Sequence, residues 1–180
     1  STTQLNMLLL RQFISILPML GALFLLTYTQ TKFTSYAKPI LLFIFLLSVS
    51  AVVENNLWWH VDSLAVFFVV LTLFFLDRDD QRFGVNFALA AASTGLTTGT
   101  KVIGLFFVLT IPTYLIIGVI SKKLTLYTAI LHGAAFVGIM VLTIIISNPF
   151  LLLSEQRDNM LKTLSRQSRS MSEGWTLSYA

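Results

Sequence analysis

Long apolar runs, separated by short polar connections, dominate the chain. Six runs are present, at 8–29, 39–53, 63–76, 83–98, 102–120 and 124–147. They are rich in Leu, Phe, Ile and Val without the strict alternation of a barrel strand, so they predict helices. A bilayer core of about 30 Å needs about 20 helical residues. The pattern therefore predicts an all-α, polytopic membrane helix bundle with about six transmembrane helices, some of them short.

Composition supports a membrane protein. The chain is 56% hydrophobic and only 11% charged, with a mean hydropathy of +0.81. Its net charge of +4 comes from small groups between the apolar runs, not from one basic stripe, which argues against a nucleic-acid partner. Membrane lipids are the expected surroundings. The absence of Cys excludes disulfides and thiol catalysis within this sequence.

Lysine and arginine are unevenly distributed between alternate connections. One set holds Lys32, Lys38, Arg78, Arg82, Lys122 and Lys123. The other set holds only Arg11 and Lys101, so the first set is predicted to be cytoplasmic. The expected protein is multi-pass, in the plasma membrane, with residues 1–153 as its transmembrane domain. Residues 154–180 are expected to begin an external loop or domain, and the start at Ser1 predicts a fragment.

The first candidate site lies in the connection after the second run. Glu54, His60 and Asp62 stand there between two apolar spans, where ionisable groups are costly unless they are paired, hydrated or bound. His60 and Asp62 are candidates to hold a divalent metal, a phosphate-bridging water or an acceptor hydroxyl, and the three residues are candidates to line an outward recess. A purely structural interpretation stays open. In it, Trp58 and Trp59 form an aromatic belt and Asp62 caps the third helix.

The second candidate site is the break between the fourth and fifth runs. Gly99, Thr100 and Lys101 are expected at the N-terminus of the fifth helix, where free backbone N–H groups and a lysine can hold a phosphate. The alternative is a lysine that only extends its ammonium to the membrane interface. We expect Glu54, His60, Asp62 and Lys101 to converge on one recess.

Other polar and small residues are interpreted as structural. His132 is expected to be packed and not to ligate a metal. A run of Ala, Ser and Gly at 88–99 predicts close packing of the fourth helix against its neighbours. The charged residues between the third and fourth runs predict a solvated cytoplasmic turn: Asp77, Arg78, Asp79, Asp80 and Arg82.

The order of these motifs resembles the GT-C superfamily of integral-membrane glycosyltransferases. The resemblance is carried by the segment 60–68, which reads HVDSLAVFF, by the segment 95–101, which reads GLTTGTK, and by Ser147-Asn148-Pro149. It is strongest to the branch of protein O-mannosyltransferases and aminoarabinose transferases. Such enzymes transfer a sugar from a polyprenyl-phosphate donor to a protein, lipid or glycan acceptor outside the cytoplasm. Their acidic general base lies in the first external loop, which the resemblance places upstream of Ser1.

Two other classes remain as alternatives. A membrane transporter or lipid flippase also has short helices and buried charges, but predicts inverted repeats and charges near the membrane midplane. No such repeat is visible, and the charges gather near the ends of the runs. A non-catalytic assembly subunit would need no convergence of acidic residues, His and Lys.

Overall fold

The computed structural model describes residues 2–57 and 61–173. Regular structure in these residues is helical, without a strand, which confirms the predicted all-α class. The elements are α1 (Thr2–Arg11), the π-helix η1 (Gln12–Ile16), α2 (Leu17–Thr31), α3 (Ala37–Leu47), α4 (Ser50–Leu57), α5 (Asp62–Asp79), α6 (Val85–Thr100), the 3₁₀-helix η2 (Val102–Leu109), α7 (Thr110–Ile120), α8 (Leu126–Ser147), the 3₁₀-helix η3 (Pro149–Leu152) and α9 (Ser154–Glu173). Residues 1–144 form one compact unit and residues 145–180 a second.

Fewer helices than predicted can cross a membrane by length and composition. In the described ranges two qualify, Thr3–Thr31 with 29 residues and Leu126–Ser147 with 22 residues. The first of them comprises α1, η1 and α2. Two further helices, Ala37–Leu47 and Gly104–Ile120, are apolar but shorter. The prediction of about six spans is therefore wrong by this criterion, and two helices meet it.

Local breaks explain two of the four predicted runs that do not qualify, whereas the unbroken helix α5 includes four charged residues and the unbroken helix α6 has only 16 residues. The predicted span 39–53 is divided, because α3 ends at Leu47 and α4 begins at Ser50. The predicted span 102–120 starts as the 3₁₀-helix η2 and becomes α-helical only at Thr110. Hydropathy alone does not reveal these breaks, because both of them fall inside or at the edge of a run that is apolar on average.

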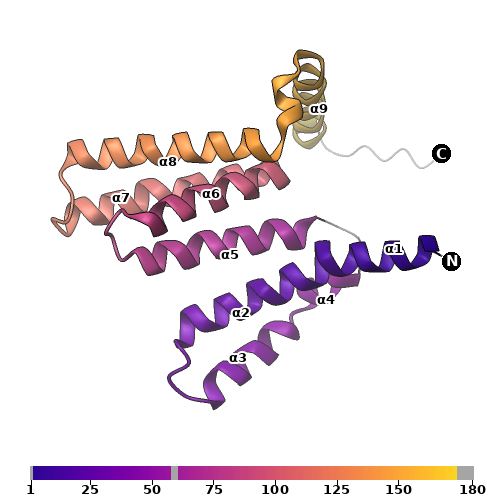
Figure 1. The fold of residues 1–180 in the computed structure, drawn as a ribbon, viewed down its shortest axis with the longest axis horizontal. Helices are drawn as coiled ribbons and strands as arrows, with labels where there is room; N and C mark the ends of the chain where they lie inside the picture. Colours follow the sequence, from indigo (N-terminus) through magenta and orange to yellow (C-terminus); the bar gives the residue numbers. More distant parts are fainter. Residues whose placement is uncertain (1, 58–60, 174–180) are drawn as a thin grey trace. The chain divides into compact units, whose positions relative to one another are not determined.

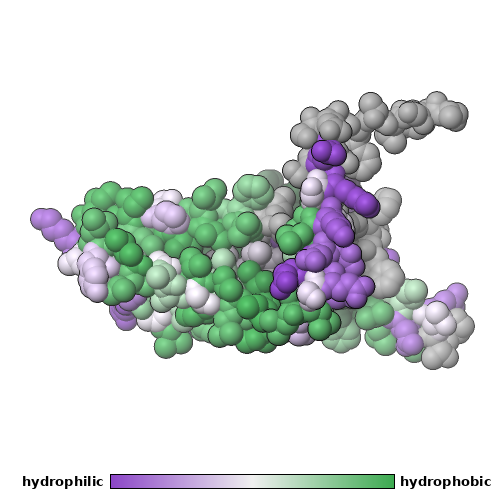
Figure 2. Space-filling model, turned by 90° about the horizontal axis from the view of Figure 1, so that it is seen from above, coloured by the Kyte–Doolittle hydropathy of each residue, from purple (hydrophilic) through white to green (hydrophobic). Residues whose placement is uncertain are grey.

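Exposed apolar side chains cover much of the first unit. On α3, Ile40, Leu41 and Phe45 are each more than half exposed, and on α8 so are Ile130 and Leu142. Figure 2 shows hydrophobic side chains in green over most of the unit's visible face, with hydrophilic side chains gathered at its left end. A surface of this kind is costly in water, which supports an apolar environment.

The core of the first unit lies between α5, α6, α7 and α8. Leu76, Phe87, Ala90, Ala91, Ile111 and Phe136 form its buried cluster. Gly95 on α6 lies so close to α8 that a β-carbon there would stand 2.6 Å from the Met140 carbonyl oxygen. The side-by-side course of α6 and α8 is visible in Figure 1. The predicted close packing by small residues of the fourth run is confirmed.

Positively charged connections gather at one end of this unit. Figure 1 shows the connections α2–α3, α5–α6 and α7–α8 at the same end. The Lys32 ammonium pairs with Asp77, and Lys123 lies 3.6 Å from Asp80. These pairs join three connections that are far apart in the sequence. The grouping of basic residues expected from the charge pattern is therefore present in space.

Asp79 is buried in the α5–α6 connection, so the expectation of a solvated turn is wrong for this residue. Its side chain is 2% exposed. The carboxylate accepts hydrogen bonds from the backbone N–H groups of Phe83 (2.9 Å) and Gly84 (3.1 Å) and from the Tyr114 hydroxyl (3.1 Å). Asp79 thus closes the turn and attaches it to α7.

We expect Asp79→Asn to destabilise the fold by about 1–3 kcal/mol, because an amide nitrogen replaces an oxygen that accepts buried hydrogen bonds. The matched control is Asp80→Asn, which alters an exposed side chain with one distant ion pair and is expected to cost under about 1 kcal/mol. Unfolding in detergent micelles, followed by circular dichroism, measures both. Equal midpoints for the two variants would contradict the structural role given to Asp79.

His132 is packed among aromatic rings, as expected. Its ring stacks on Phe83 at a centroid distance of 5.0 Å and meets Phe87 edge-on at 6.1 Å. The imidazole therefore extends the aromatic core between α6 and α8.

The second unit is built around the polar helix α9. Backbone bonds from Leu151 to Asn148 and from Leu153 to Phe150 shape η3 ahead of it. Phe150, Leu152 and Leu153 are all exposed. An apolar segment thus precedes the polar helix.

Candidate functional site

The candidate site forms where α5 begins and α6 ends. Asp62 is the first residue of α5, and Lys101 directly follows the last residue of α6. Because α5 and α6 are antiparallel neighbours, these two helix ends lie together (Figure 1). A hydrogen bond of 3.3 Å between the Thr72 and Thr94 hydroxyls links the two helices closer to their middle.

Asp62 and Lys101 form an ion pair. The Lys101 ammonium donates to the Asp62 carboxylate over 2.5 Å. The Asp62 side chain is 29% exposed and that of Lys101 43%. An anion at a helix N-terminus and a cation at a helix C-terminus are each favoured by the helix dipole. The pair is therefore well placed electrostatically and is also accessible.

The backbone at Lys101 sets the direction of its side chain. Lys101 is extended, with φ −150° and ψ 126°, and this conformation ends α6. The Gly104 N–H then donates to the Lys101 carbonyl over 2.8 Å, which begins η2. A β-carbon on Gly104 would lie 2.6 Å from the Thr97 methyl group, so only glycine permits this return of the chain over α6.

A pocket of about 280 Å³ opens beside the ion pair. It is lined from α5 by Asp62, Ala65, Val66 and Val69, from the end of α6 by Thr97 and Lys101, and from η2 by Gly104 and Phe107. One charged pair thus stands at an otherwise largely apolar pocket. Such a pocket suits a ligand with an anionic group and an apolar part.

Comparison with protein-family models, curated proteins and solved structures finds no significant match. Function is therefore inferred from the chemistry of the site.

The other predicted site residues are placed differently. Glu54 is exposed on α4 and is not among the residues that line the pocket. His60 lies outside the described residues, as do Trp58 and Trp59. The structure thus brings Asp62 and Lys101 together and places Glu54 elsewhere on the surface.

Gly99 and Thr100, the expected phosphate cradle, stand at the C-terminus of one α-helix and not at the N-terminus of the next. Both residues belong to the last turn of α6, and η2, not an α-helix, follows Lys101. The Thr100 hydroxyl donates to the Leu96 carbonyl over 2.7 Å. At a helix C-terminus the dipole repels an anion, so Lys101 is the residue left to attract a phosphate there.

The predicted divalent-metal site at His60 and Asp62 stays a prediction, because His60 lies outside the described residues. Within the described ranges, no group of three or more His, Asp or Glu side chains is arranged so that it could hold a metal ion. The Asp62 carboxylate already accepts from an ammonium, which would compete with a metal for the same oxygen atoms. No chemical step is assigned to a metal here.

Sequence reasoning missed the hydroxyls of α6 that bond within their own helix. Those of Ser93, Thr94, Thr97, Thr98 and Thr100 each donate to the carbonyl one turn earlier, at 2.7–3.0 Å. It also missed Ser63, which follows Asp62 and whose fully buried hydroxyl has no hydrogen-bond partner among the described residues. Its position directly after Asp62 is the signal that was available. Gly104 comes three residues after Lys101, and this spacing would have indicated the turn in which the Gly104 N–H donates to the Lys101 carbonyl.

Proposed function

We propose that this chain is part of an integral-membrane glycosyltransferase that transfers a sugar from a polyprenyl-phosphate donor to a protein, lipid or glycan acceptor. The Asp62–Lys101 pair carries this proposal. It places one accessible ammonium beside an apolar pocket, and the donor combines a phosphate with an apolar chain. The resemblance of the motifs around both residues to GT-C enzymes gives the reaction class.

The proposed chemistry assigns separate tasks to the two residues. The Lys101 ammonium binds the donor phosphate and stabilises the negative charge that builds on it as the sugar leaves. Asp62 holds the ammonium at the pocket until the donor arrives. Acceptor activation requires a base, and the proposal assigns that role to neither Asp62 nor Lys101.

The proposed architecture is a polytopic bundle in the plasma membrane with the pocket on the extracytoplasmic side. Two helices are long enough to span, and we propose that the shorter apolar helices accompany them as partial spans. The exposed apolar residues of α3 support this proposal, because no residue of that helix is buried. The end that carries Lys32, Arg78 and Lys122 is then cytoplasmic.

Cysteine labelling tests this orientation, and the sequence contains no cysteine of its own. In intact cells, a cysteine at Glu54 is expected to react with a membrane-impermeant maleimide. Cysteines at Arg82 and Lys122 are expected to react only after permeabilisation, because they lie at the positively charged end. Labelling in the reverse pattern would place the pocket on the cytoplasmic side and contradict the proposal.

A transfer assay tests the activity itself. Membranes that contain the whole protein are supplied with polyprenyl-phosphate-linked radioactive mannose or aminoarabinose. The expected result is loss of label from the lipid and its appearance on an acceptor. A transporter or flippase would instead move the intact lipid-linked sugar across the membrane. Label that stays on the lipid with both donors, under conditions where Asp62→Asn changes nothing, would contradict the glycosyltransferase.

A further inference from the structure

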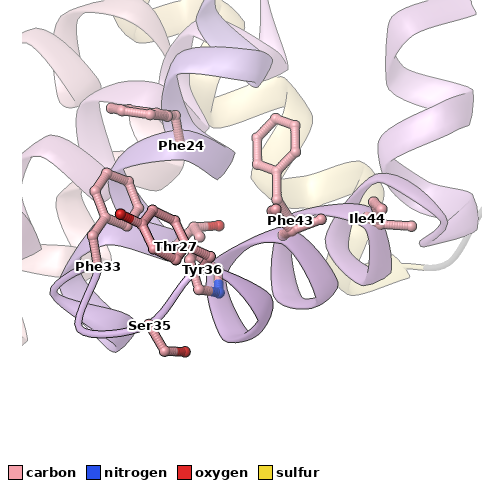
Figure 3. Close-up of a pocket in the computed structure, with 9 residues that line it drawn as sticks. Phe24, Thr27, Phe33, Ser35, Tyr36, Phe43 and Ile44 are labelled. Carbon is pink, nitrogen blue, oxygen red and sulfur yellow. The ribbon is translucent and has the colours of Figure 1, made fainter.

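A second cavity lies between α2 and α3, separate from the candidate site. It measures about 420 Å³, within the size range of ligand pockets. Its walls include Phe24, Phe33, Tyr36, Ile40, Phe43 and Ile44. Figure 3 shows the labelled aromatic side chains arranged around the space between the two helices.

The position of this cavity sets it apart from the donor pocket. It adjoins the α2–α3 connection, where Lys32 pairs with Asp77 near the end of α5. Asp62 stands at the beginning of the same 18-residue helix. At about 1.5 Å per residue the two ends are about 25 Å apart. One ligand head group cannot contact Lys101 and this cavity at once.

The walls of the cavity suit a hydrocarbon chain. Its lining is almost entirely apolar, and α2 belongs to a helix that is long and apolar enough to span a membrane. Ile40 and Ile44 line the cavity and are each 58% exposed, so the space is open to the surroundings of α3. In a bilayer those surroundings are acyl chains, and one of them would cover this apolar surface.

A basic residue is the sequence neighbour of one lining residue of the cavity. Lys38 directly precedes Pro39, which lines it, and Lys38 is exposed. Within the described part of the chain, Lys32 and Lys123 have carboxylate partners, whereas the Lys38 ammonium has none. Lys38 is also the second residue of α3, where the helix dipole favours an anion. An unpaired cation beside an apolar cavity is complementary to an anionic amphiphile.

We propose that this cavity holds one acyl chain of an anionic phospholipid whose phosphate pairs with Lys38. The lipid fills the space between α2 and α3 and so fixes α3 against the rest of the first unit. This site is independent of the proposed transfer reaction. It assigns a bound lipid to the basic end of the unit, opposite the end that carries Asp62.

Photolabelling in lipid nanodiscs tests the proposal. The whole protein is reconstituted in phosphatidylcholine with a small fraction of phosphatidylglycerol that carries a diazirine in its acyl chain. We expect the label in the peptide that contains residues 24–44, and we expect unlabelled phosphatidylglycerol to compete better than phosphatidylcholine. Label spread evenly over all apolar helices, without this competition, would indicate ordinary surrounding lipid and overturn the site.

Two variants, each with a matched control, distinguish binding of the lipid's acyl chain from binding of its head group. Ile44→Trp should fill the cavity and lower labelling at least about fivefold, whereas Leu41→Trp, on the same helix but outside the lining, should not. Lys38→Gln should remove the preference for phosphatidylglycerol, and Lys122→Gln should preserve it. Unchanged labelling in Ile44→Trp would overturn the chain site, and unchanged preference in Lys38→Gln would overturn the head-group contact. A dimer whose interface blocks labelling of the wild type would overturn both.

Discussion

Under the proposed function, replacing Lys101 by Met in the intact protein is expected to lower sugar transfer about 10-fold or more, which corresponds to a loss of at least about 1.4 kcal/mol of transition-state stabilisation. Met keeps the apolar stem of the side chain but removes the charge that the leaving phosphate needs. Lys101→Arg is expected to retain part of the activity, because guanidinium also binds phosphate. Initial rates with saturating and limiting donor separate a loss of binding from a loss in the chemical step.

A purely structural role of Lys101 predicts a different result, namely that turnover is the same in Lys101→Met and in the wild type. The ion pair with Asp62 is partly exposed and contributes about 0–1 kcal/mol to folding. The Lys101→Met variant should therefore unfold at nearly the same denaturant concentration as the wild type. Lys123→Met provides the control, since it removes another partly exposed lysine that pairs with Asp80 at the basic end. Equal turnover of wild type and Lys101→Met at matched expression would contradict the phosphate-binding role.

Substituting Gly95 by Ala is expected to destabilise the helix bundle by about 1–3 kcal/mol, the usual cost of overpacking a core. The added methyl group would meet the Met140 carbonyl oxygen at 2.6 Å and the Thr143 β-carbon at 2.8 Å. Backbone atoms of α8 cannot move aside alone, so α6 and α8 must separate. The gain in helix propensity from Gly to Ala is about 1 kcal/mol and offsets only part of this cost.

Gly138→Ala is the matched control, because it lies on α8 with no neighbouring atom within 4 Å of the added carbon. This substitution should leave stability unchanged or raise it by up to about 1 kcal/mol. Unfolding of both variants in the same detergent gives the comparison. A Gly95→Ala protein as stable as Gly138→Ala would mean that the two helices are not in close contact.

The sequence predicted the features that depend on residue type. Apolar runs predicted helices, and the alternation of basic connections predicted which ends gather together. Asp62 and Lys101 were expected at one recess, and they form an ion pair. These features could be inferred because hydropathy and charge act over whole segments.

The features that were missed depend on local backbone geometry. The break between α3 and α4 falls at Ser48 and Val49, within the apolar run 39–53, whose only polar residues are Ser48 and Ser50. Asp79 is indistinguishable in sequence from its exposed neighbour Asp80. Its burial follows from the left-handed backbone at Asp80 and at Phe83, which folds the turn around the carboxylate. Composition contains no signal for such a fold of the chain.

The hydroxyl-bearing residues of α6 change what its composition means in a membrane. A serine or threonine whose proton is already donated to a carbonyl of its own helix offers few unmet hydrogen bonds to its surroundings. The free energy of transferring such a helix from water into lipid is therefore lower than the sum of the transfer free energies of free hydroxyl groups. A segment of this kind can move into a bilayer together with its neighbours while still retaining polar atoms within reach of a ligand.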